Sequence, residues 1–259
     1  MKLQNNIFIK SIFTLVNMFF FSFSVCADTQ TKLQSVYSDK YKQTLNVVLI
    51  LFDWARRDAI GVYSDKDVST PNIDKLAKAG VRFDNAYTTA TLCSPARASI
   101  ITGVYPHAHG VRKTMYPAGI NGSLPTMYKK PIANPFDEEN FSLAINFPKY
   151  VTNSGFATAH IGKWHLGTGN PGFFDLFKSY NSLMPHWLDE PDNSPYREDL
   201  QTNEGIRFIQ KNADRPFFLY QSFYTPHAPF QPPQKYLDIY KNRKVDHEKY
   251  YAAVSSLDA

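Results

Sequence analysis

The sequence predicts an α/β fold with a mixed, mostly parallel central sheet that is flanked by helices on both faces. Three apolar, β-rich runs indicate its strands, at residues 45–52, 156–161 and 217–223. Continuous apolar runs are typical of parallel strands that are buried on both faces, and segments with a helical pattern separate these three along the chain. Because ligands of open α/β sheets bind beyond the carboxyl ends of the strands, we expect the functional residues to follow these runs.

Residues 1–27 are expected to be a secretory signal peptide. Lys2 and Lys10 precede an apolar run that ends near Val25, and a small-residue cleavage site follows it. The run contains Asn17 and is shorter than the roughly 20 apolar residues of a membrane-spanning helix. We therefore expect an exported bacterial protein, periplasmic or secreted, that is not stably inserted in the membrane after cleavage.

A polar lead-in is expected over residues 28–44, followed by one α/β domain over residues 45–259. The net charge of +5 comes from Lys and Arg residues scattered along the chain, without a basic helix or a nucleic-acid motif. We expect no nucleic-acid partner, although a mild basic excess favours the capture of an anionic substrate. After signal cleavage Cys93 is the sole cysteine, so its thiol is buried, intermolecular or chemically used.

Helices and one further strand are expected between the three apolar runs. Pro71 opens a helix that Gly80 ends, and a strand over residues 81–87 follows it. The pattern predicts further helices over residues 148–153 and 200–212, and from residue 246 onward the chain resembles a helix of a known protein family.

A short helix is expected directly after Cys93. Ser94 can cap this helix, Pro95 suits its first position, and Gly103 can end it in a left-handed conformation. A helix N-terminus favours an anionic group near the Cys93 sulfur. Arg97, one turn further on, can reach back to hold an oxyanion or to lower the pKa of a nucleophile. The alternative is a buried structural cysteine, and the helix position alone does not decide between the two.

Charged and titratable residues follow each apolar run. Asp53 comes directly after the first run, where it is either a metal ligand or an acid of a cap or turn. Lys163 and His165 follow the second run, and in an extended segment both would point to one face and meet a single anion. His227 lies just beyond the third run. Because parallel strands share a carboxyl edge, we expect these residues to assemble around one anion site.

Other notable residues receive structural interpretations. His107 and His109 are separated by one residue but have no acid nearby, which favours a role in loop structure, or in supporting other site residues from behind, over metal binding. Residues 112–142 are irregular and rich in Pro and Gly, which is typical of a functional rim or a mobile insertion. Residues 172–177 are expected to contribute aromatic packing.

Residues 93–103, with the pattern Cys-x-Pro-x-Arg followed by Thr-Gly, closely resemble the signature of the type I sulfatases. Residues 162–167 (Gly-Lys-Trp-His-Leu-Gly) and 224–230 (Tyr-Thr-Pro-His-Ala-Pro-Phe) are similar to two further segments of that family. The resemblance spans residues 45–259. It implies an alkaline-phosphatase-like fold and the oxidation of Cys93 to formylglycine by a formylglycine-generating maturation enzyme.

The resemblance also implies roles for single residues. Asp53 and the formylglycine at Cys93 would bind Ca²⁺, and Arg97 would help to deprotonate the formylglycine hydrate. Lys163 and His165 would contact the sulfate and the nucleophilic or leaving oxygen. His227 would bind the sulfate or protonate the leaving group. The implied reaction removes sulfate from an aryl or carbohydrate ester, so the expected partner is a sulfated small molecule or polysaccharide.

Two departures from the family pattern leave alternatives open. Trp54 stands where many sulfatases carry a second acid or an amide, and an indole cannot coordinate a hard cation. Family members also continue past the region that matches, with further calcium ligands, another lysine and a smaller C-terminal domain. We therefore expect the N-terminal part of a sulfatase, truncated before these features. The alternatives are a phosphonate or phosphodiester hydrolase on the same scaffold, and an inactive fragment or degenerate binding protein.

Overall fold

The structure is a computed structural model. It describes residues 45–64, 66–115, 146–167, 171–179, 186–187, 189 and 191–259. The expected signal peptide, the lead-in and most of the Pro- and Gly-rich segment 112–142 lie outside these residues. Residues 46–259 form one compact unit, which is described here by itself. None of the helices in the described part of the chain has the length and apolar character needed to cross a membrane.

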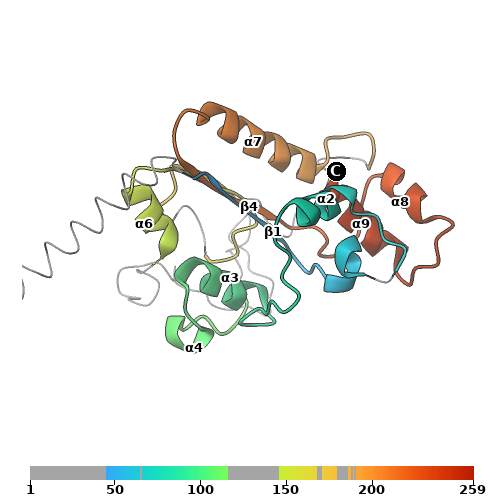
Figure 1. Ribbon diagram of the computed structural model, residues 1–259, viewed down its shortest axis with the longest axis horizontal. Coiled ribbons are helices and arrows are strands. Elements are labelled where there is room, and N and C mark those ends of the chain that lie inside the picture. Colours follow the sequence, from blue (N-terminus) through green and yellow to red (C-terminus); the bar gives the residue numbers. More distant parts are fainter. Residues whose placement is uncertain are drawn as a thin grey trace, which may run out of the picture. The chain divides into compact units, whose positions relative to one another are not determined.

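A parallel sheet of four strands forms the centre of this unit (Figure 1). The strands are β1 (Val47–Phe52), β2 (Ala157–Gly162), β3 (Leu176–Ser179) and β4 (Phe217–Phe223), in the spatial order β1-β4-β2-β3. All three strand pairings are parallel, and Leu219 of β4 lies between Val48 of β1 and Ala159 of β2. The prediction of an α/β fold with a mostly parallel sheet is confirmed.

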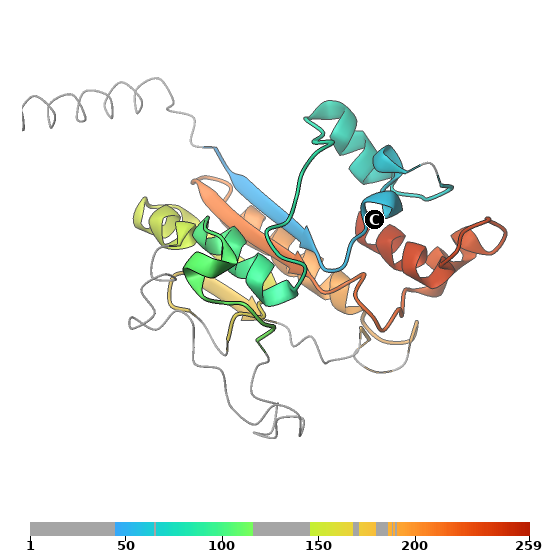
Figure 2. The same ribbon diagram turned by 90° about the horizontal axis from the view of Figure 1, so that it is seen from below.

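Helices cover both faces of the sheet. They are α2 (Pro71–Ala79), α3 (Cys93–Thr102), α4 (Pro106–His109), α6 (Phe147–Asn153), α7 (Arg197–Lys211), α8 (Gln234–Tyr240) and α9 (Glu248–Asp258), with short 3₁₀ turns at Arg57–Ala59 and Gly61–Tyr63. The long helix α7 lies on one face, whereas α3 and α6 lie on the other (Figures 1 and 2). The helices predicted over residues 148–153, over 200–212 and from 246 onward are all present, with ends shifted by a few residues.

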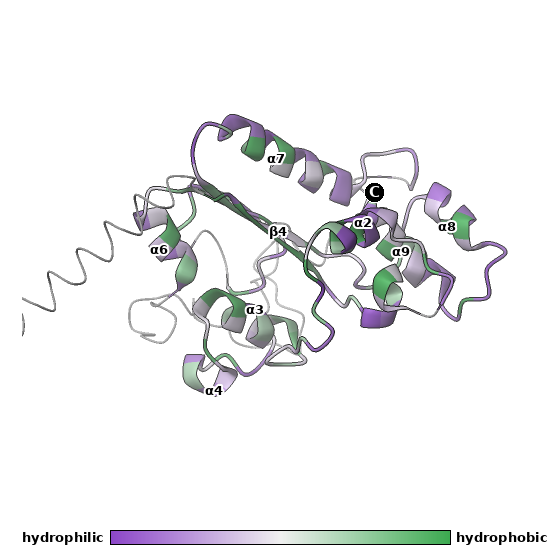
Figure 3. Ribbon diagram, viewed as in Figure 1, coloured by the Kyte–Doolittle hydropathy of each residue, from purple (hydrophilic) through white to green (hydrophobic). Residues whose placement is uncertain are grey.

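The central strand β4 contributes to two hydrophobic cores because its side chains alternate between faces. Phe218 and Tyr220 pack into the core beneath α3 and α6, whereas Phe217 and Leu219 pack against α7. Strand β4 is accordingly hydrophobic over most of its length (Figure 3). Each fully buried side chain of this kind stabilises the fold by about 1.5–3 kcal/mol. The two cores hold the sheet rigid below its carboxyl edge.

A third core joins α8 and α9 to the segment after β1. It contains Tyr240, Tyr250 and Tyr251. The ring of each tyrosine packs within this core, and the hydroxyl of each makes a hydrogen bond. At the end of α9, the Asp258 carboxylate accepts hydrogen bonds from the amides of Asn72 (2.9 Å) and Ile73 (2.7 Å). An acid from a distant helix therefore caps α2, whose own N-cap side chain makes no capping bond.

Two expectations about strands are wrong. Residues 81–87 do not form a strand, and Tyr87 is 88% exposed, because no described strand lies beside them to pair with. Strand β1 is present but is not buried on both faces, since Val48 and Ile50 are about half exposed. The reason is its place at the edge of the sheet, where the described residues leave part of its surface uncovered.

The start of α3 also differs from the expectation. The helix begins at Cys93 itself, with Leu92 as the N-cap and no side-chain capping bond, so Pro95 occupies the third position. Ser94 does not cap the helix because its hydroxyl donates to the carbonyl of His165 at 2.7 Å. Gly103 ends the helix in the left-handed region (φ 71°), as predicted.

A buried histidine makes the stability of the fold depend on pH. His160 of β2 lies among the rings of Trp164, Phe177 and Tyr220. Burial, together with the nearby positive charge of Arg97, lowers the pKa of His160 from 6.5 to about 3. Between these two pH values the unfolded chain binds a proton at His160 that the folded chain does not. The contribution of His160 to the free energy of unfolding is therefore fully present above pH 6.5 and is lost as the pH decreases toward 3.

We predict that His160→Leu flattens this pH dependence. The wild-type chain should lose up to about 1.4 kcal/mol per pH unit through His160, and the variant should lack that contribution. Urea unfolding at several pH values between the two limits measures both slopes. His107→Ala, which changes an exposed histidine, serves as the control and should leave the slope unchanged. Equal slopes for His160→Leu and the wild type would contradict the prediction.

Candidate functional site

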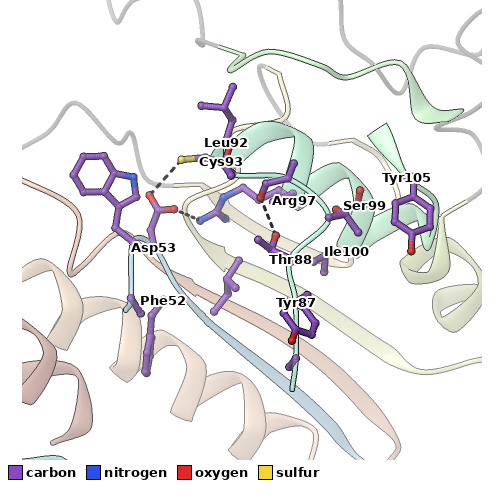
Figure 4. A pocket seen from close by; sticks show the side chains of 18 of the residues that line it. Phe52, Asp53, Tyr87, Thr88, Leu92, Cys93, Arg97, Ser99, Ile100 and Tyr105 are labelled. Atoms are coloured by element: carbon purple, nitrogen blue, oxygen red, sulfur yellow. Dashed lines mark hydrogen bonds and ion pairs between the residues drawn. The ribbon is translucent and has the colours of Figure 1, made fainter. Parts of the chain in front are cut away.

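A cavity of about 760 Å³ opens at the carboxyl ends of the parallel strands. Asp53 enters it directly after β1, and Cys93 and Arg97 enter it from the first turn of α3. Figure 4 shows these three side chains pointing toward one another. Residues 86–92, which lead into α3, also line the cavity. The cavity therefore lies at the edge of the sheet where the sequence placed a site.

An ion cluster of one acid and two bases occupies this edge. Lys163, which follows β2, donates a hydrogen bond to Asp53 Oδ2, and Arg97 Nη2 lies 3.4 Å from Asp53 Oδ1. The side chains of Lys163 and Arg97 are only 2% exposed, and Asp53 is 6% exposed. Buried charges persist only when they are paired, and here one carboxylate serves two cations. The cluster keeps a formal charge of +1, which favours an anionic ligand.

Arg97 is fixed by the ends of two strands. Its Nη1 donates to the carbonyl of Lys163 (2.7 Å) and to the hydroxyl of Ser222 (2.6 Å), a residue of β4. The planar guanidinium therefore has little freedom to reorient. Gly162 permits this arrangement, because a Cβ at that position would lie 1.9 Å from the carbonyl oxygen of Ser222.

Cys93 lies within reach of the cluster. Its Sγ is 4.0 Å from Asp53 Oδ2 and 3.8 Å from Lys163 Nζ. Burial and the Asp53 carboxylate raise the pKa of the thiol and outweigh the opposing effects of Lys163 and Arg97. Arg97 does act to lower the pKa of the thiol, as expected, but burial and Asp53 outweigh this effect. As a thiol, Cys93 is a poor nucleophile at neutral pH.

The protonation of the ion pair follows from its surroundings. Burial alone would raise the pKa of Asp53, but Arg97 and Lys163 hold it below its ordinary value. Burial lowers the pKa of Lys163 despite the adjacent carboxylate. Asp53 is therefore ionised at neutral pH, and the Lys163 ammonium gives up its proton more readily than an exposed lysine would.

His165 reaches the site by a route that the sequence did not indicate. Its φ of 59° lies in the left-handed region, so the chain turns at His165 and does not continue the extended segment that was expected. Ser94 holds this turn through the hydrogen bond to the His165 carbonyl. Burial and the nearby Lys163 and Arg97 lower the pKa of His165 to about 3, which keeps the imidazole neutral.

His227 follows β4 and has its imidazole fixed by its own loop. Its Nδ1 lies 2.7 Å from the carbonyl oxygen of Ala228. Because a carbonyl only accepts hydrogen bonds, Nδ1 carries a proton, and Nε2 of the neutral ring then carries the lone pair. Burial lowers the pKa of His227, and Lys163 adds to this effect. When it is protonated, His227 also acts electrostatically on Asp53 and His165, so all the predicted site residues lie in one electrostatic neighbourhood.

Tyr224 is a site residue that the sequence did not reveal. Lys163 Nζ lies 4.7 Å from the centre of its ring, and the His227 ring stacks on it at 4.6 Å. Behind it, His186 stacks on Tyr224 at 5.4 Å and is 3.0 Å from Glu198 of α7. The sequence could have indicated Tyr224 through its position directly before the Thr-Pro-His segment. It could not have indicated the contacts of Tyr224 with residues that are distant in the sequence.

His109 has the structural role expected of it. It is buried, its Nε2 lies 3.0 Å from the hydroxyl of Ser99, and its Nδ1 accepts from the amide of Val111 at 3.1 Å. These bonds tie α4 to α3. Likewise Phe173 and Phe174 belong to the main core, as expected for the aromatic segment 172–177.

The described residues do not make a calcium site by themselves. Among them, no group of three or more acidic, His or Cys side chains is placed to hold a metal ion. Both oxygens of Asp53 are engaged by cations, and the carbonyl of Trp54 accepts a hydrogen bond from the Tyr250 hydroxyl at 2.9 Å. A calcium ion requires about six to eight oxygen ligands, and Asp53 is one carboxylate.

The fold and the site define a parallel α/β protein with a pocket of net positive charge at the carboxyl edge of its sheet. The family comparison makes this specific, since the sulfatase family model matches residues 45–259. The chain belongs to the sulfatase family. Its alkaline-phosphatase-like fold is shared by solved structures, among them Ps i-CgsB in complex with k-i-k-neocarrahexaose, at 26% identity and a TM-score of 0.65 over 83% of this chain and 53% of that one.

Curated relatives agree with this assignment. The uncharacterized sulfatase YidJ of Escherichia coli (strain K12) is 32% identical over 75% of this chain and 41% of the relative. An arylsulfatase of Clostridium perfringens (strain 13 / Type A) is 30% identical over 77% of this chain and 47% of the relative. The chain thus spans less than half the length of these relatives.

We predict strong energetic coupling between Asp53 and Lys163. Lys163→Met should destabilise the fold by about 3 kcal/mol, because Asp53 would remain buried with only Arg97 as a partner, and Asp53→Asn should cost a similar amount. The double variant should be less destabilised than the sum, by about 1–3 kcal/mol. Urea unfolding of the four chains measures this coupling. Arg243→Ala, which breaks an exposed ion pair with Asp67, should cost about 1 kcal/mol or less. Strict additivity of the two single variants would contradict the prediction.

Proposed function

We propose that this chain carries the nucleophile and the anion-binding groups of a sulfatase that hydrolyses aryl or carbohydrate sulfate esters. The observation that carries the proposal is the placement of Cys93 beside Asp53 and Lys163 in a buried pocket of net positive charge. A sulfate monoester is an anion, and Lys163 and Arg97 are the cations that would bind it. The raised pKa of the Cys93 thiol is a further support, because it favours a nucleophile other than the cysteine itself.

The proposed nucleophile is a formylglycine formed from Cys93. A maturation enzyme would oxidise the CH₂SH group to an aldehyde, which replaces the sulfur and two hydrogens with one oxygen. The hydrate of that aldehyde supplies one hydroxyl to attack sulfur and a second whose deprotonation expels sulfate after the alcohol has left. Lys163, whose pKa burial lowers, is placed to exchange a proton with the group at residue 93. Arg97 is held by two strand ends and would stabilise the negative charge that develops on the sulfate oxygens.

His227 is the better candidate for protonating the leaving alcohol. The pKa of His165 is lowered to about 3, so this residue remains neutral and would act as a hydrogen-bonding group. His227 is less buried, and an anionic ester bound beside it would raise its pKa and favour the protonated form. Its fixed Nδ1 leaves Nε2 to deliver the proton.

Relatives of this chain support a saccharide substrate without selecting one. They include an N-acetylglucosamine-6-O-sulfatase of Bacteroides thetaiotaomicron at 27% identity and an ulvan-active sulfatase of Formosa agariphila at 30%. A solved structure of BT4656 holds D-glucosamine-2-N,6-O-disulfate, at 27% identity and a TM-score of 0.58. We propose that this chain, like them, acts on a sulfated sugar or a related ring-bearing ester. We also propose that it does so after export to the periplasm or the medium, as the expected signal peptide implies.

We predict that the chain, purified from a host that supplies the maturation enzyme, hydrolyses 4-nitrophenyl sulfate. The peptide that contains residue 93 should be about 18 Da lighter than the cysteine form, which mass spectrometry measures. Cys93→Ala should lower turnover at least about 10³-fold without unfolding the chain. Hydrolysis of bis(4-nitrophenyl) phosphate, assayed in parallel, tests the phosphodiester alternative. A folded chain with an unmodified thiol and no turnover would identify an inactive fragment or a binding protein.

Calcium is the ion that the sulfatase resemblance implies, and this chain would offer it Asp53 and the group derived from Cys93. We predict weak binding, with a dissociation constant no lower than about 10⁻⁴ M, because these two groups are few for a cation that takes six to eight oxygen ligands. Calorimetric titration with CaCl₂ measures it, and Asp53→Asn should remove the residual binding. Micromolar binding that survives this substitution would show that the ligands lie elsewhere.

A further inference from the structure

The side chain of Trp54 combines two unusual features. It is 57% exposed although it is a large aromatic group, and its φ of 66° lies in the left-handed region that bulky residues rarely adopt. Such a backbone conformation is strained and persists only when the surroundings enforce it. Neighbouring residues must therefore hold the turn that carries this exposed indole.

Tyr250 of α9 enforces this conformation. Its hydroxyl donates to the carbonyl of Trp54 at 2.9 Å and accepts from the amide of Arg56 at 2.7 Å. The tyrosine itself is buried in the core of α8 and α9, so the turn after β1 rests on a rigid support. The hydrogen bonds of Tyr250 thus fix the backbone that carries the indole, while much of the indole surface stays open to solvent.

An apolar hollow of about 370 Å³ adjoins the indole. Trp54, Phe230 and Tyr250 provide its aromatic walls, and Arg56 and His247 lie at its margin. The rings of Phe230 and Tyr250 meet edge to face with their centres 5.6 Å apart. This volume is near the lower limit of ligand pockets and is large enough for one six-membered ring.

The hollow borders the anion pocket through Trp54. The same indole lines the cavity that contains Asp53 and Cys93. Its ring centre also lies 4.0 Å from that of His227, with the two planes tilted by 33°. The indole therefore lies between the hollow and the imidazole of His227. An alcohol that takes a proton from His227 would leave beside this indole.

We propose that Trp54, Phe230 and Tyr250 form a subsite that binds the six-membered ring carrying the sulfate ester, by stacking of that ring on the indole. A pyranose presents a face of C–H groups and an aryl group presents a π face, and both pack well on an aromatic surface. This subsite rests on the proposed function in one respect, namely that the anion bound near Cys93 is an ester. Trp54 thereby determines specificity for ring-bearing esters over ring-free ones.

The experiment measures binding rather than turnover, so that it does not depend on catalysis. The Cys93→Ala chain is titrated by calorimetry with three probes, namely 4-nitrophenyl sulfate, glucose 6-sulfate and ethyl sulfate. Trp54→Ala in that background should weaken binding of a ring-bearing probe about tenfold and leave ethyl sulfate within about twofold. Trp54→Phe should restore most of the affinity, and Phe230→Ala should weaken binding in the same direction. Tyr150→Ala, which removes an exposed aromatic group on α6, is the control and should change nothing.

The outcomes separate the subsite from the reaction. Weakening of only one ring-bearing probe identifies the ring as aryl or sugar and upholds the subsite. Equal weakening of ethyl sulfate would mean that Trp54 merely positions His227, and it overturns the subsite while the sulfatase proposal stands. Trp54-dependent ring binding, combined with no hydrolysis by the chain that keeps Cys93 and is purified from a host with the maturation enzyme, upholds the subsite and overturns the proposed reaction. Failure of all three probes to bind overturns both.

Discussion

The site depends on the buried ion cluster of Asp53, Lys163 and Arg97. Each of these residues is positioned by a different element, and each can be buried only because the opposite charge beside it offsets the loss of hydration. The cluster can therefore form only when β1, β2 and α3 are in register with one another. Electrostatics here acts as a constraint on geometry, since displacing one member would leave a charge buried without its partner. The same constraint fixes the position of Cys93, whose sulfur lies next to Asp53 and Lys163 of the cluster.

The fold provides that register through contacts to the backbone rather than through the charges alone. Arg97 donates hydrogen bonds to the carbonyl of Lys163, directly after β2, and to the hydroxyl of Ser222 near the end of β4. Ser94, on the same turn of α3, holds the carbonyl of His165. Because α3 contacts the sheet at these points, the helix that presents Cys93 is also the element that fixes the loop after β2. The hydrophobic packing of α3 against Tyr220 and its neighbours then keeps the helix from sliding.

The sequence predicts the parts of this arrangement that are local. The apolar runs predict the strands, and short patterns with fixed spacing mark Cys93, Arg97, Lys163 and His227. What it misses depends on contacts between distant segments. The pKa of Cys93 is raised by burial and by the Asp53 carboxylate that lies close to it in space, and no spacing near residue 93 indicates either effect. The edge position of β1 and the lack of a partner for residues 81–87 are properties of the whole sheet.

Trp54 changes the charge balance of the pocket as well as its shape. An acid at position 54 would add a negative charge to the lining of the pocket, and the indole adds none. With an indole in that position, Lys163 and Arg97 outnumber the one carboxylate, and the pocket retains a positive charge from its own side chains. The same residue extends an aromatic surface from the charged pocket to the hollow lined by Phe230 and Tyr250. The residue that departs from the sulfatase pattern therefore joins the two properties that a sulfated ring requires, which are a positive charge for the sulfate and an apolar face for the ring.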